Sequence, residues 1–417
     1  MRKTFFLNFA LLLLHSIIWA QPQKLYFDPA YAQGMPQSKI FDSIQYIPLE
    51  TTKESLLGRV SQLVVTGEYI IVLDNDTKAI YFFDWHGKFI KKYSDRKYDI
   101  KSIFYSKEKN ALFISELNKN YSPSKREIQD ALDNPLNNQA VKNTRAVYYY
   151  LDDVLAEKII PLKDFDIAVL NPVAFNHKLW VYSHIYANKN WENKEDFELK
   201  ISDGKEIIAT YFPYNKKTSS LYYGRPERIP FFKTANKTSL LFTRPYRYTV
   251  YELTPDSVAE RYTIILPSSN TIPNTFYSQS FDTRSKLEDF KMNNPGLVWG
   301  IENVVDTKAY LFFGLDIYRS FRDRNYLFEK KTAQFFNLSK IAADSTNAFL
   351  PVASYGIQYY DEDYLYSSTS SASMFNNKDA NASRNPQYNE VITKYFTNSK
   401  SSANPVVIVL KPKSNSK

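Results

Sequence analysis

The chain has 417 residues, a formal net charge of +9 and no cysteine. The lack of cysteine excludes disulfides, thiolate nucleophiles and cysteine-ligated zinc. The 33 tyrosines and 29 phenylalanines favour strands. The 10 glycines fall well below the usual share of about 7%, which argues against phosphate-cradling loops. Neither of the motifs of such loops, GxGxxG and GxxxxGK[ST], is found.

The N-terminus has the form of a secretory signal peptide. Arg2 and Lys3 precede a mostly apolar stretch, residues 5–20, that is shorter than the roughly 20 apolar residues of a membrane-spanning helix. We therefore expect residues 1–20 to be removed and residues 21–417 to form one exported domain, periplasmic or extracellular; an uncleaved membrane anchor is the alternative. No cysteine follows the apolar stretch, so we expect no lipid anchor. The remaining positive charge would attract acidic partners, and no nucleic acid is expected.

Residues 60–93 predict a four-stranded antiparallel meander. Four short runs rich in β-branched and aromatic residues are separated by turn segments such as DNDT and DWHG. Groups of the same kind recur with little identity between them, and this recurrence is typical of a propeller. The later groups cover residues 100–162, 167–212, 228–267, 297–341 and 351–413.

The sixth group contains three strands, one fewer than the others. The unassigned segment 38–50 could supply the missing strand, by pairing of the residues around Ile44 with those around Val407. Such pairing closes the ring and leaves few exposed sheet edges. We therefore predict an all-β fold, a six-bladed β-propeller closed by its N-terminal strand, with short helical insertions on one face. A β-sandwich or two barrels is the alternative, which leaves the missing strand unexplained.

Residues 41–93, which read FDSIQYIPLE through FIKKY, resemble the six-bladed β-propeller proteins that Bacteroidetes export, distant relatives of NHL-repeat propellers. Residues 246–264 and 404–413 add to the resemblance. It implies the fold and export, but it carries no activity, catalytic residue or cofactor. The sequence departs from the family twice, because many members are lipoproteins and because SDRKYDIKS (94–102) replaces the usual glycine-rich stretch.

The long loops of the predicted propeller fall on one face. If the strands of each blade are lettered a to d from the axis outward, the b-to-c loops and d-to-a links open on one face, here called the insertion-bearing face. The short a-to-b and c-to-d turns open on the other, the plain face. Binding residues concentrate in loops on rigid scaffolds, so the insertion-bearing face is the predicted functional one, although drift in tolerated loops would give the same pattern. The long segments are 117–145, 184–196, 213–228, 268–296 and 368–403.

Three of these insertions carry helix signals. SPSKREIQDALDN (122–134) has a Ser124-x-x-Glu127 capping box, and SKLEDFKMNNPG (285–296) has a Ser285-x-x-Glu288 box followed by a stop. The third helix, in PQYNEVITKYF, is expected to begin at Pro386. All three are expected to stand on the same rim.

Arginines and aromatic residues gather in the loops of the insertion-bearing face. A guanidinium group offers two parallel donors to a carboxylate or sulfate, and aromatic faces add apolar contact. The alternative is that each arginine is solvated or paired with a nearby carboxylate while the rings pack the rim. The predicted ligand-binding residues are Trp191, Tyr223, Arg225, Arg244, Tyr246, Arg247, Tyr318, Arg319 and Arg322.

No catalytic residue, metal site or cofactor is predicted. His86 and His177 belong to the plain face and His184 to the other, so they cannot converge on one ion. The DxD at Asp74 and Asp76 is a turn, because Lys78 takes the next ligand position of a calcium loop.

We therefore expect a binding or interaction module with an extracellular glycan, an acidic peptide or a cell-surface protein as its partner, bound over the axis. A polysaccharide hydrolase or lyase, which would use carboxylates with Arg and Tyr on the same face, is the first alternative. A purely structural component of a cell-surface complex is the second.

Overall fold

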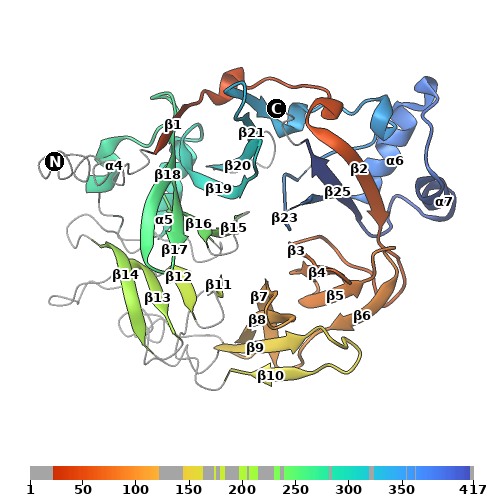
Figure 1. Ribbon diagram of the computed structural model, residues 1–417, viewed down its shortest axis with the longest axis horizontal. Coiled ribbons are helices and arrows are strands. Elements are labelled where there is room, and N and C mark those ends of the chain that lie inside the picture. The colour runs from red at the N-terminus through yellow and green to blue at the C-terminus, as the bar shows by residue number, and fades with distance from the viewer. Residues whose placement is uncertain are drawn as a thin grey trace, which may run out of the picture.

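Six sheets surround a central axis in the computed structural model (Figure 1). This arrangement confirms the predicted six-bladed β-propeller. In blades 1, 2, 3 and 5 the strands follow one another in chain order from the axis outward. The structure describes residues 22–121, 144–162, 173–174, 179–183, 197–203, 206–214, 230–234, 239–279, 281, 284–318, 324–353, 355–361 and 363–413.

The first three blades lie where the first three meanders were predicted. All pairings within them are antiparallel. Their strands are β3 (Gln62–Val65), β4 (Ile70–Asp74), β5 (Ala79–Phe83) and β6 (Phe89–Tyr93) in blade 1; β7 (Tyr98–Ser106), β8 (Ala111–Asn118), β9 (Thr144–Tyr150) and β10 (Ile159–Pro161) in blade 2; and β11 (Val173–Ala174), β12 (Trp180–Ser183), β13 (Phe197–Ser202) and β14 (Ile207–Pro213) in blade 3.

The other three blades complete the ring. Blade 4 gains a fifth strand, and blade 6 takes its outermost strand from the N-terminus. Their strands are β15 (Phe231–Lys233), β16 (Leu240–Thr243), β17 (Thr249–Thr254), β18 (Ser257–Ile265) and β1 (Gln23–Tyr26) in blade 4; β19 (Val298–Asp306), β20 (Tyr310–Ile317), β21 (Asn325–Glu329) and β22 (Gln334–Asn337) in blade 5; and β23 (Tyr359–Tyr360), β24 (Leu365–Thr369), β25 (Val406–Pro412) and β2 (Phe41–Pro48) in blade 6.

The middle strands of a blade are apolar on both faces because each blade packs between two neighbours. Every residue of β4 and of β5 is buried, whereas the outermost strand β6 is mostly half-buried. Alternation of polar and apolar residues, which marks a strand with one wet face, is therefore weak in the middle strands and stronger toward the periphery.

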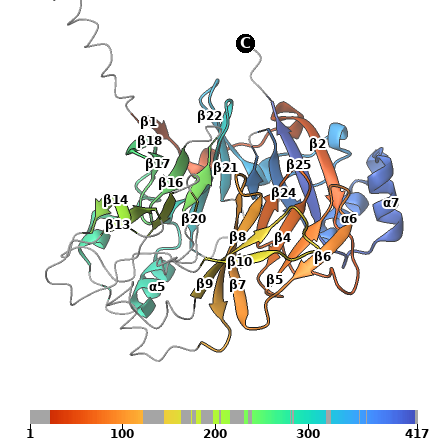
Figure 2. The same cartoon turned by 60° about the horizontal axis from the view of Figure 1, so that its bottom comes forward.

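The ring closes as predicted. β2 pairs antiparallel with β25, so that Ile44 faces Leu410 and Ile47 faces Val407, and the two strands lie side by side in both views (Figure 1 and Figure 2). Asn404, just before β25, reinforces the closure, because its buried amide donates to the carbonyl oxygens of Glu50 and Ser55 at 2.7 and 2.9 Å.

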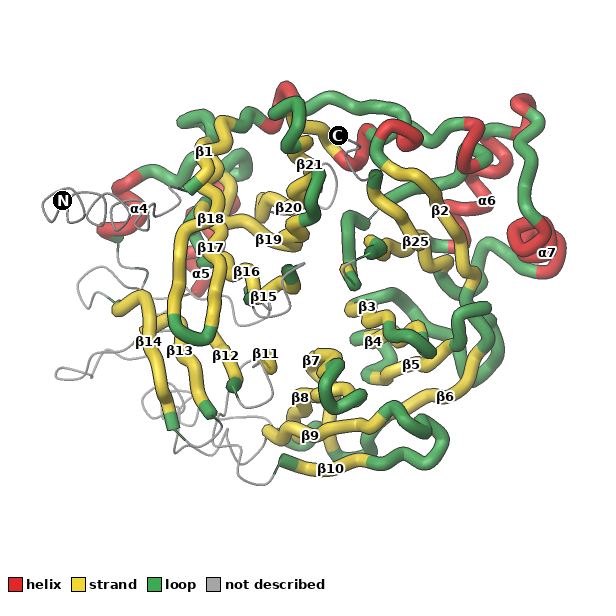
Figure 3. Tube along the Cα trace, viewed as in Figure 1, coloured by secondary structure: helices red, strands yellow, loops and turns green. Residues whose placement is uncertain are grey.

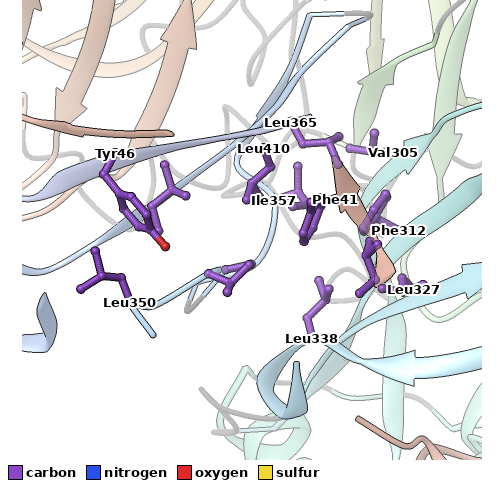
Figure 4. Close-up of a cluster of buried hydrophobic side chains, with 14 of the residues drawn as sticks. Phe41, Tyr46, Val305, Phe312, Leu327, Leu338, Leu350, Ile357, Leu365 and Leu410 are labelled. Atoms are coloured by element: carbon purple, nitrogen blue, oxygen red, sulfur yellow. The ribbon is translucent and has the colours of Figure 1, made fainter. Parts of the chain in front are cut away.

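A buried apolar cluster, here called the closure cluster, joins blades 5 and 6 where the ring closes (Figure 4). Phe41 and Tyr46 of β2 pack with residues of β19, β20 and β21 from the preceding blade, and with residues of β24 and β25 from their own. Burial of such side chains contributes about 1.5–3 kcal/mol each. Those labelled in the figure are Val305, Phe312, Leu327, Leu338, Leu350, Ile357, Leu365 and Leu410, with Phe41 and Tyr46.

The segment before β2 forms a strap, residues 23–40, that the sequence did not reveal. β1 pairs in parallel with β18, and isolated bridges then join Gln33 to Phe336 and Pro36 to Ala342. The strap thus runs past blades 4 and 5 before entering blade 6 (Figure 1). Its short 3-10 turns are η1 (Pro29–Tyr31) and η2 (Gln37–Lys39), and η3 (Leu338–Lys340) and η4 (Ser345–Asn347) lie in the blade 5 to 6 link.

Asp344 fixes the end of the strap. Its carboxylate accepts from the Gln37 amide at 2.9 Å, from the backbone N–H of Ser38 at 3.2 Å and from that of Thr346 at 3.0 Å. Burial acts to raise the pKa of Asp344, but hydrogen bonds from Thr346, Ser38 and Gln37 outweigh it and hold the pKa below its usual value.

An Asp344→Asn variant is therefore expected to be less stable than the wild type at pH 7. A carboxyl whose pKa is lower in the folded than in the unfolded state stabilises the fold above about pH 4, and that contribution is lost as the pH falls. Urea unfolding at pH 7 and pH 3 should show the difference between the two proteins shrinking at the lower pH. Asp42→Asn, at an exposed position of β2, is the matched control. An equal deficit at both pH values would contradict this account.

The 268–296 link contains two helices, α4 (Asn274–Ser278) and α5 (Arg284–Asn293). α5 confirms the helix predicted there, and it ends at Asn293, the first residue of the NNPG stop. The predicted capping box is wrong, because the helix already begins at Arg284 and Ser285 lies within it. The helix predicted in 122–134 lies outside the described residues.

The 368–403 insertion contains α6 (Ser371–Ala380), η5 (Ala382–Arg384) and α7 (Glu390–Asn398). α7 begins later than predicted, because Asn389 caps it by accepting from the backbone of Ile392 at 3.0 Å. Both helices lie at the periphery beyond β2 (Figure 3), and their buried residues Met374, Ile392 and Tyr395 join the closure cluster. They therefore support the outer strand of blade 6 and do not frame the axis. None of the helices that the structure describes is long and apolar enough to cross a lipid bilayer.

Candidate functional site

Four of the nine predicted ligand-binding residues are described. Arg244, Tyr246 and Arg247 form the b-to-c turn of blade 4, between β16 and β17, and Tyr318 follows β20 of blade 5. The positions of Trp191, Tyr223, Arg225, Arg319 and Arg322 lie outside the described residues.

Arg244 is held by a buried carboxylate. Its Nε and Nη2 lie 2.8 and 2.7 Å from Oε2 of Glu198, and its guanidinium lies 4.1 Å from the ring centroid of Phe212. Burial raises the pKa of Glu198, although the Arg244 charge opposes it. Arg244 therefore matches the alternative of an arginine paired with a nearby carboxylate, and its charge is largely compensated.

Tyr246 is a core residue. Its side chain is 3% exposed and packs in an aromatic cluster with Phe276 and Trp299, while its backbone N–H donates to the Trp299 carbonyl at 2.8 Å. Its φ of +60° turns the chain sharply between the two arginines. The helices of the 268–296 link cover this ring, so Tyr246 lies in the core beneath the loop. Tyr318 packs against the same cluster and is half-buried.

Arg247 is exposed and its guanidinium lies 4.3 Å from the ring centroid of Tyr277, in α4. Nη1 donates to the carbonyl oxygen of Tyr246 at 3.2 Å, and the Tyr277 hydroxyl donates to the same oxygen at 2.7 Å. Within the described part of the chain no carboxylate lies within ion-pair distance of Arg247. The guanidinium is thus oriented by the ring and hydroxyl of Tyr277 and by one carbonyl, and none of these contacts neutralises its charge.

Other arginines of the insertion-bearing face resemble Arg244 rather than Arg247. Arg145 of β9 forms ion pairs with Glu116 and Asp95, and its guanidinium lies 4.1 Å from the ring centroid of Tyr98. Burial raises the pKa of Glu116, and Arg145 opposes the rise. Arg324 lies 3.3 Å from Glu302. Unlike Arg145, Arg244 and Arg324, Arg247 forms no ion pair with a carboxylate of the described residues, so it is available to an external anion.

Three residues of the site were missed from the sequence: Glu198, Phe212 and Tyr277. Glu198 and Phe212 come from blade 3, and Tyr277 lies 30 positions after Arg247, so no local spacing connects them to the arginines. The site is also off the axis, because a b-to-c turn joins the second and third strands of a blade. The geometry of the site suits a carboxylate or sulfate group that accepts hydrogen bonds from Arg247. The described residues hold no cluster of three metal-ligating side chains.

Comparisons with known proteins bear on the fold. A family model described as a 6-bladed beta-propeller matches residues 28–96, and no curated protein matches the sequence. A candidate exported protein of Bacteroides fragilis NCTC 9343 has the same fold, with 15% identity, a TM-score of 0.61 and coverage of 94% of this chain and 99% of that one.

Two further solved structures are less similar. An oligogalacturonate lyase in complex with manganese has 7% identity and a TM-score of 0.40, over 94% of this chain and 90% of that one. The extracellular domain of a hybrid two-component system from B. thetaiotaomicron has 10% identity and a TM-score of 0.36, over 82% and 38%. At these scores neither likeness carries an argument about activity.

Proposed function

We propose that this chain, a six-bladed β-propeller like the family matched over residues 28–96, is an exported module that binds an acidic extracellular glycan on its insertion-bearing face. The observation that carries the proposal is Arg247, an exposed guanidinium oriented by Tyr277 and unpaired with any carboxylate of the described residues. Export rests on the N-terminal signal pattern, and the B. fragilis protein of the same fold is itself a candidate exported protein.

Arg247 can contribute to binding in two ways. A charge-assisted hydrogen bond contributes about 1.5–3 kcal/mol, and two parallel donors add directional selectivity for planar acid groups. Stacking on Tyr277 fixes the plane of the guanidinium in advance, so less side-chain entropy is lost when the ligand binds. An acidic peptide presents the same carboxylate group and is the second ligand to test.

Arg247→Ala is therefore expected to weaken binding of polygalacturonate at least tenfold in isothermal titration calorimetry with residues 21–417. Arg247→Lys should lose most of that affinity too, because a lysine keeps the charge but not the planar pair of donors. Binding by the wild type should fall as salt is added.

Arg384→Ala is the matched control. Arg384 is also exposed and lies 4.8 Å from the ring centroid of Phe349, but it belongs to η5 at the periphery. Neutral amylose and polyglutamate serve as the other ligands. Loss of affinity in Arg384→Ala equal to that in Arg247→Ala, or wild-type binding no tighter to polygalacturonate than to amylose, would exclude this site.

One observation favours the alternative of a polysaccharide hydrolase or lyase. Oε1 of Glu198 is buried without a hydrogen-bond partner among the described residues, and burial raises the pKa of this carboxyl, as expected of a general acid or base. Release of reducing ends or of unsaturated uronates during incubation with polygalacturonate tests this alternative on the same protein.

A further inference from the structure

Lys233 of blade 4 contacts two other blades across the axis. Its Nζ donates to the hydroxyl of Tyr359, in blade 6, at 2.9 Å. The same nitrogen lies 5.7 and 5.6 Å from the ring centroids of Phe104 and Tyr105, in blade 2, and 4.9 Å from that of Tyr359. Blades 2, 4 and 6 are not neighbours in the ring, so their side chains can meet only across the axis (Figure 1).

This cluster, Lys233 with Phe104, Tyr105 and Tyr359, stands at the plain-face end of the axis. β7, β15 and β23 are the innermost strands of their blades, and each enters an a-to-b turn on the plain face at its C-terminal end. Lys233 is the last residue of β15, and the other three residues lie within two positions of the ends of β7 and β23. The cluster therefore lies at the opposite end of the molecule from Arg247.

The charge of Lys233 has no carboxylate partner in the part of the chain that the structure describes. Another half-buried lysine, Lys330, shows the contrast, because its Nζ lies 2.5 Å from Oδ1 of Asp306 and donates to the Thr307 carbonyl at 2.6 Å. An ammonium group carries three donors, and Lys233 gives one of them to Tyr359.

All four side chains of the cluster are half-buried, so solvent reaches them. Burial raises the pKa of the Tyr105 hydroxyl, and Tyr359, Glu108 and Glu68 add to the rise. The carboxylates of Glu68 and Glu108 therefore lower the positive potential in this region, although neither forms an ion pair with Lys233. An anion that binds here must gain from direct contact with the ammonium and from ring contact, because the surrounding field does not favour it.

We propose that this cluster is a second ligand site, in which Lys233 binds the carboxylate of a small acidic sugar that enters from the plain face. The carboxylate accepts the ammonium donors that have no acceptor among the described residues, and the apolar face of the sugar ring lies against Tyr105 or Tyr359. The site shares no residue with the Arg247 site, so it does not depend on the function proposed there.

Isothermal titration with sodium D-glucuronate, and with methyl D-glucoside as the neutral counterpart, tests the proposal. We expect the wild type to bind glucuronate and not the glucoside. Lys233→Met, whose side chain has a similar length but no charge, should lose at least tenfold in affinity for glucuronate. Tyr359→Phe keeps the ring and removes one hydroxyl, and its affinity should stay within about threefold of the wild type. Lys233→Met should cause the same loss of glucuronate affinity in the Arg247→Ala background as in the wild type, which separates the two sites.

Two results would overturn the proposal: equal binding of glucuronate and glucoside, and unchanged affinity in Lys233→Met. Unchanged affinity together with a lower melting temperature would show that Lys233 only joins the three blades. If Lys233→Met does not fold, acetylation of Lys233 in the wild type can be followed by mass spectrometry. Glucuronate should slow this acetylation at least twofold relative to the glucoside, and no protection would count against the site.

Discussion

Replacing Tyr46 by alanine is expected to lower the free energy of unfolding by about 3–5 kcal/mol, the loss typical of a buried aromatic residue cut back to a methyl group. Tyr46 is 5% exposed and lies in β2, the strand that closes the ring. Its hydroxyl donates to the carbonyl of Pro351 at 2.9 Å and accepts from the amide of Asn347 at 2.9 Å. The substitution therefore opens a cavity in the closure cluster and removes one hydrogen bond each from the Pro351 carbonyl and the Asn347 amide, which keeps its bond to the Leu350 carbonyl. Urea unfolding at pH 7 measures the loss.

Two further variants separate the contributions at Tyr46. Tyr46→Phe keeps the ring and should cost about 1–3 kcal/mol, the penalty for unsatisfied buried partners. Gln45→Ala, on the exposed side of the same strand, should change stability by less than about 0.5 kcal/mol. If Tyr46→Ala were no more harmful than Gln45→Ala, β2 would not hold the ring closed.

Phe276→Ala is expected to reduce both stability and ligand binding. Phe276 is fully buried, and its ring centroid lies 5.2 Å from that of Tyr246 and 5.7 Å from that of Trp299. Loss of the ring should lower the free energy of unfolding by about 3–5 kcal/mol, because the ring packs α4 against the propeller. Because Tyr277 is the next residue and stacks on Arg247, we expect the affinity for polygalacturonate to fall at least fivefold.

Thr275→Ala, exposed in the same helix, is the control and should change neither quantity. Hydrogen exchange of α4 reports whether the helix has loosened. A Phe276→Ala protein that shows fast exchange in α4 but binds with wild-type affinity would show that Arg247 acts without support from Tyr277.

The fold could be predicted because its signals are local and repeated. Five of the six predicted groups contain four short apolar runs, and segment 38–50 was the unassigned strand that could complete the sixth. The strap escaped prediction because β1 buries a single side chain, Leu25, of its four residues, so its sequence shows no strand pattern. The later start of α7 has a similar cause, since Asn389 and Pro386 are both good helix starts and only the structure shows which is used.

The site was predicted in part. The turn carrying Arg244 and Arg247 was found because arginines beside aromatic residues are conspicuous in a loop. The sequence could not show that Glu198 neutralises Arg244 while Arg247 is left exposed, because that depends on contacts between blades. The sequence could not show that Tyr246 lies in the core, since the link that buries it begins more than 20 residues later. Lys233 was not singled out, because a lone lysine at a strand end carries no pattern of its own.

The pairing of β2 with β25 also sets an order of events when the chain is made. β2 is among the first strands synthesised, yet its partner lies more than 350 residues later. Blades 1, 2, 3 and 5 can assemble from neighbouring segments as they emerge, but β2 stays without its partner until β25 is complete. Contacts this distant in sequence slow folding. A chain whose synthesis stops before β25 therefore keeps an open ring, with unpaired strand edges that can pair with other chains.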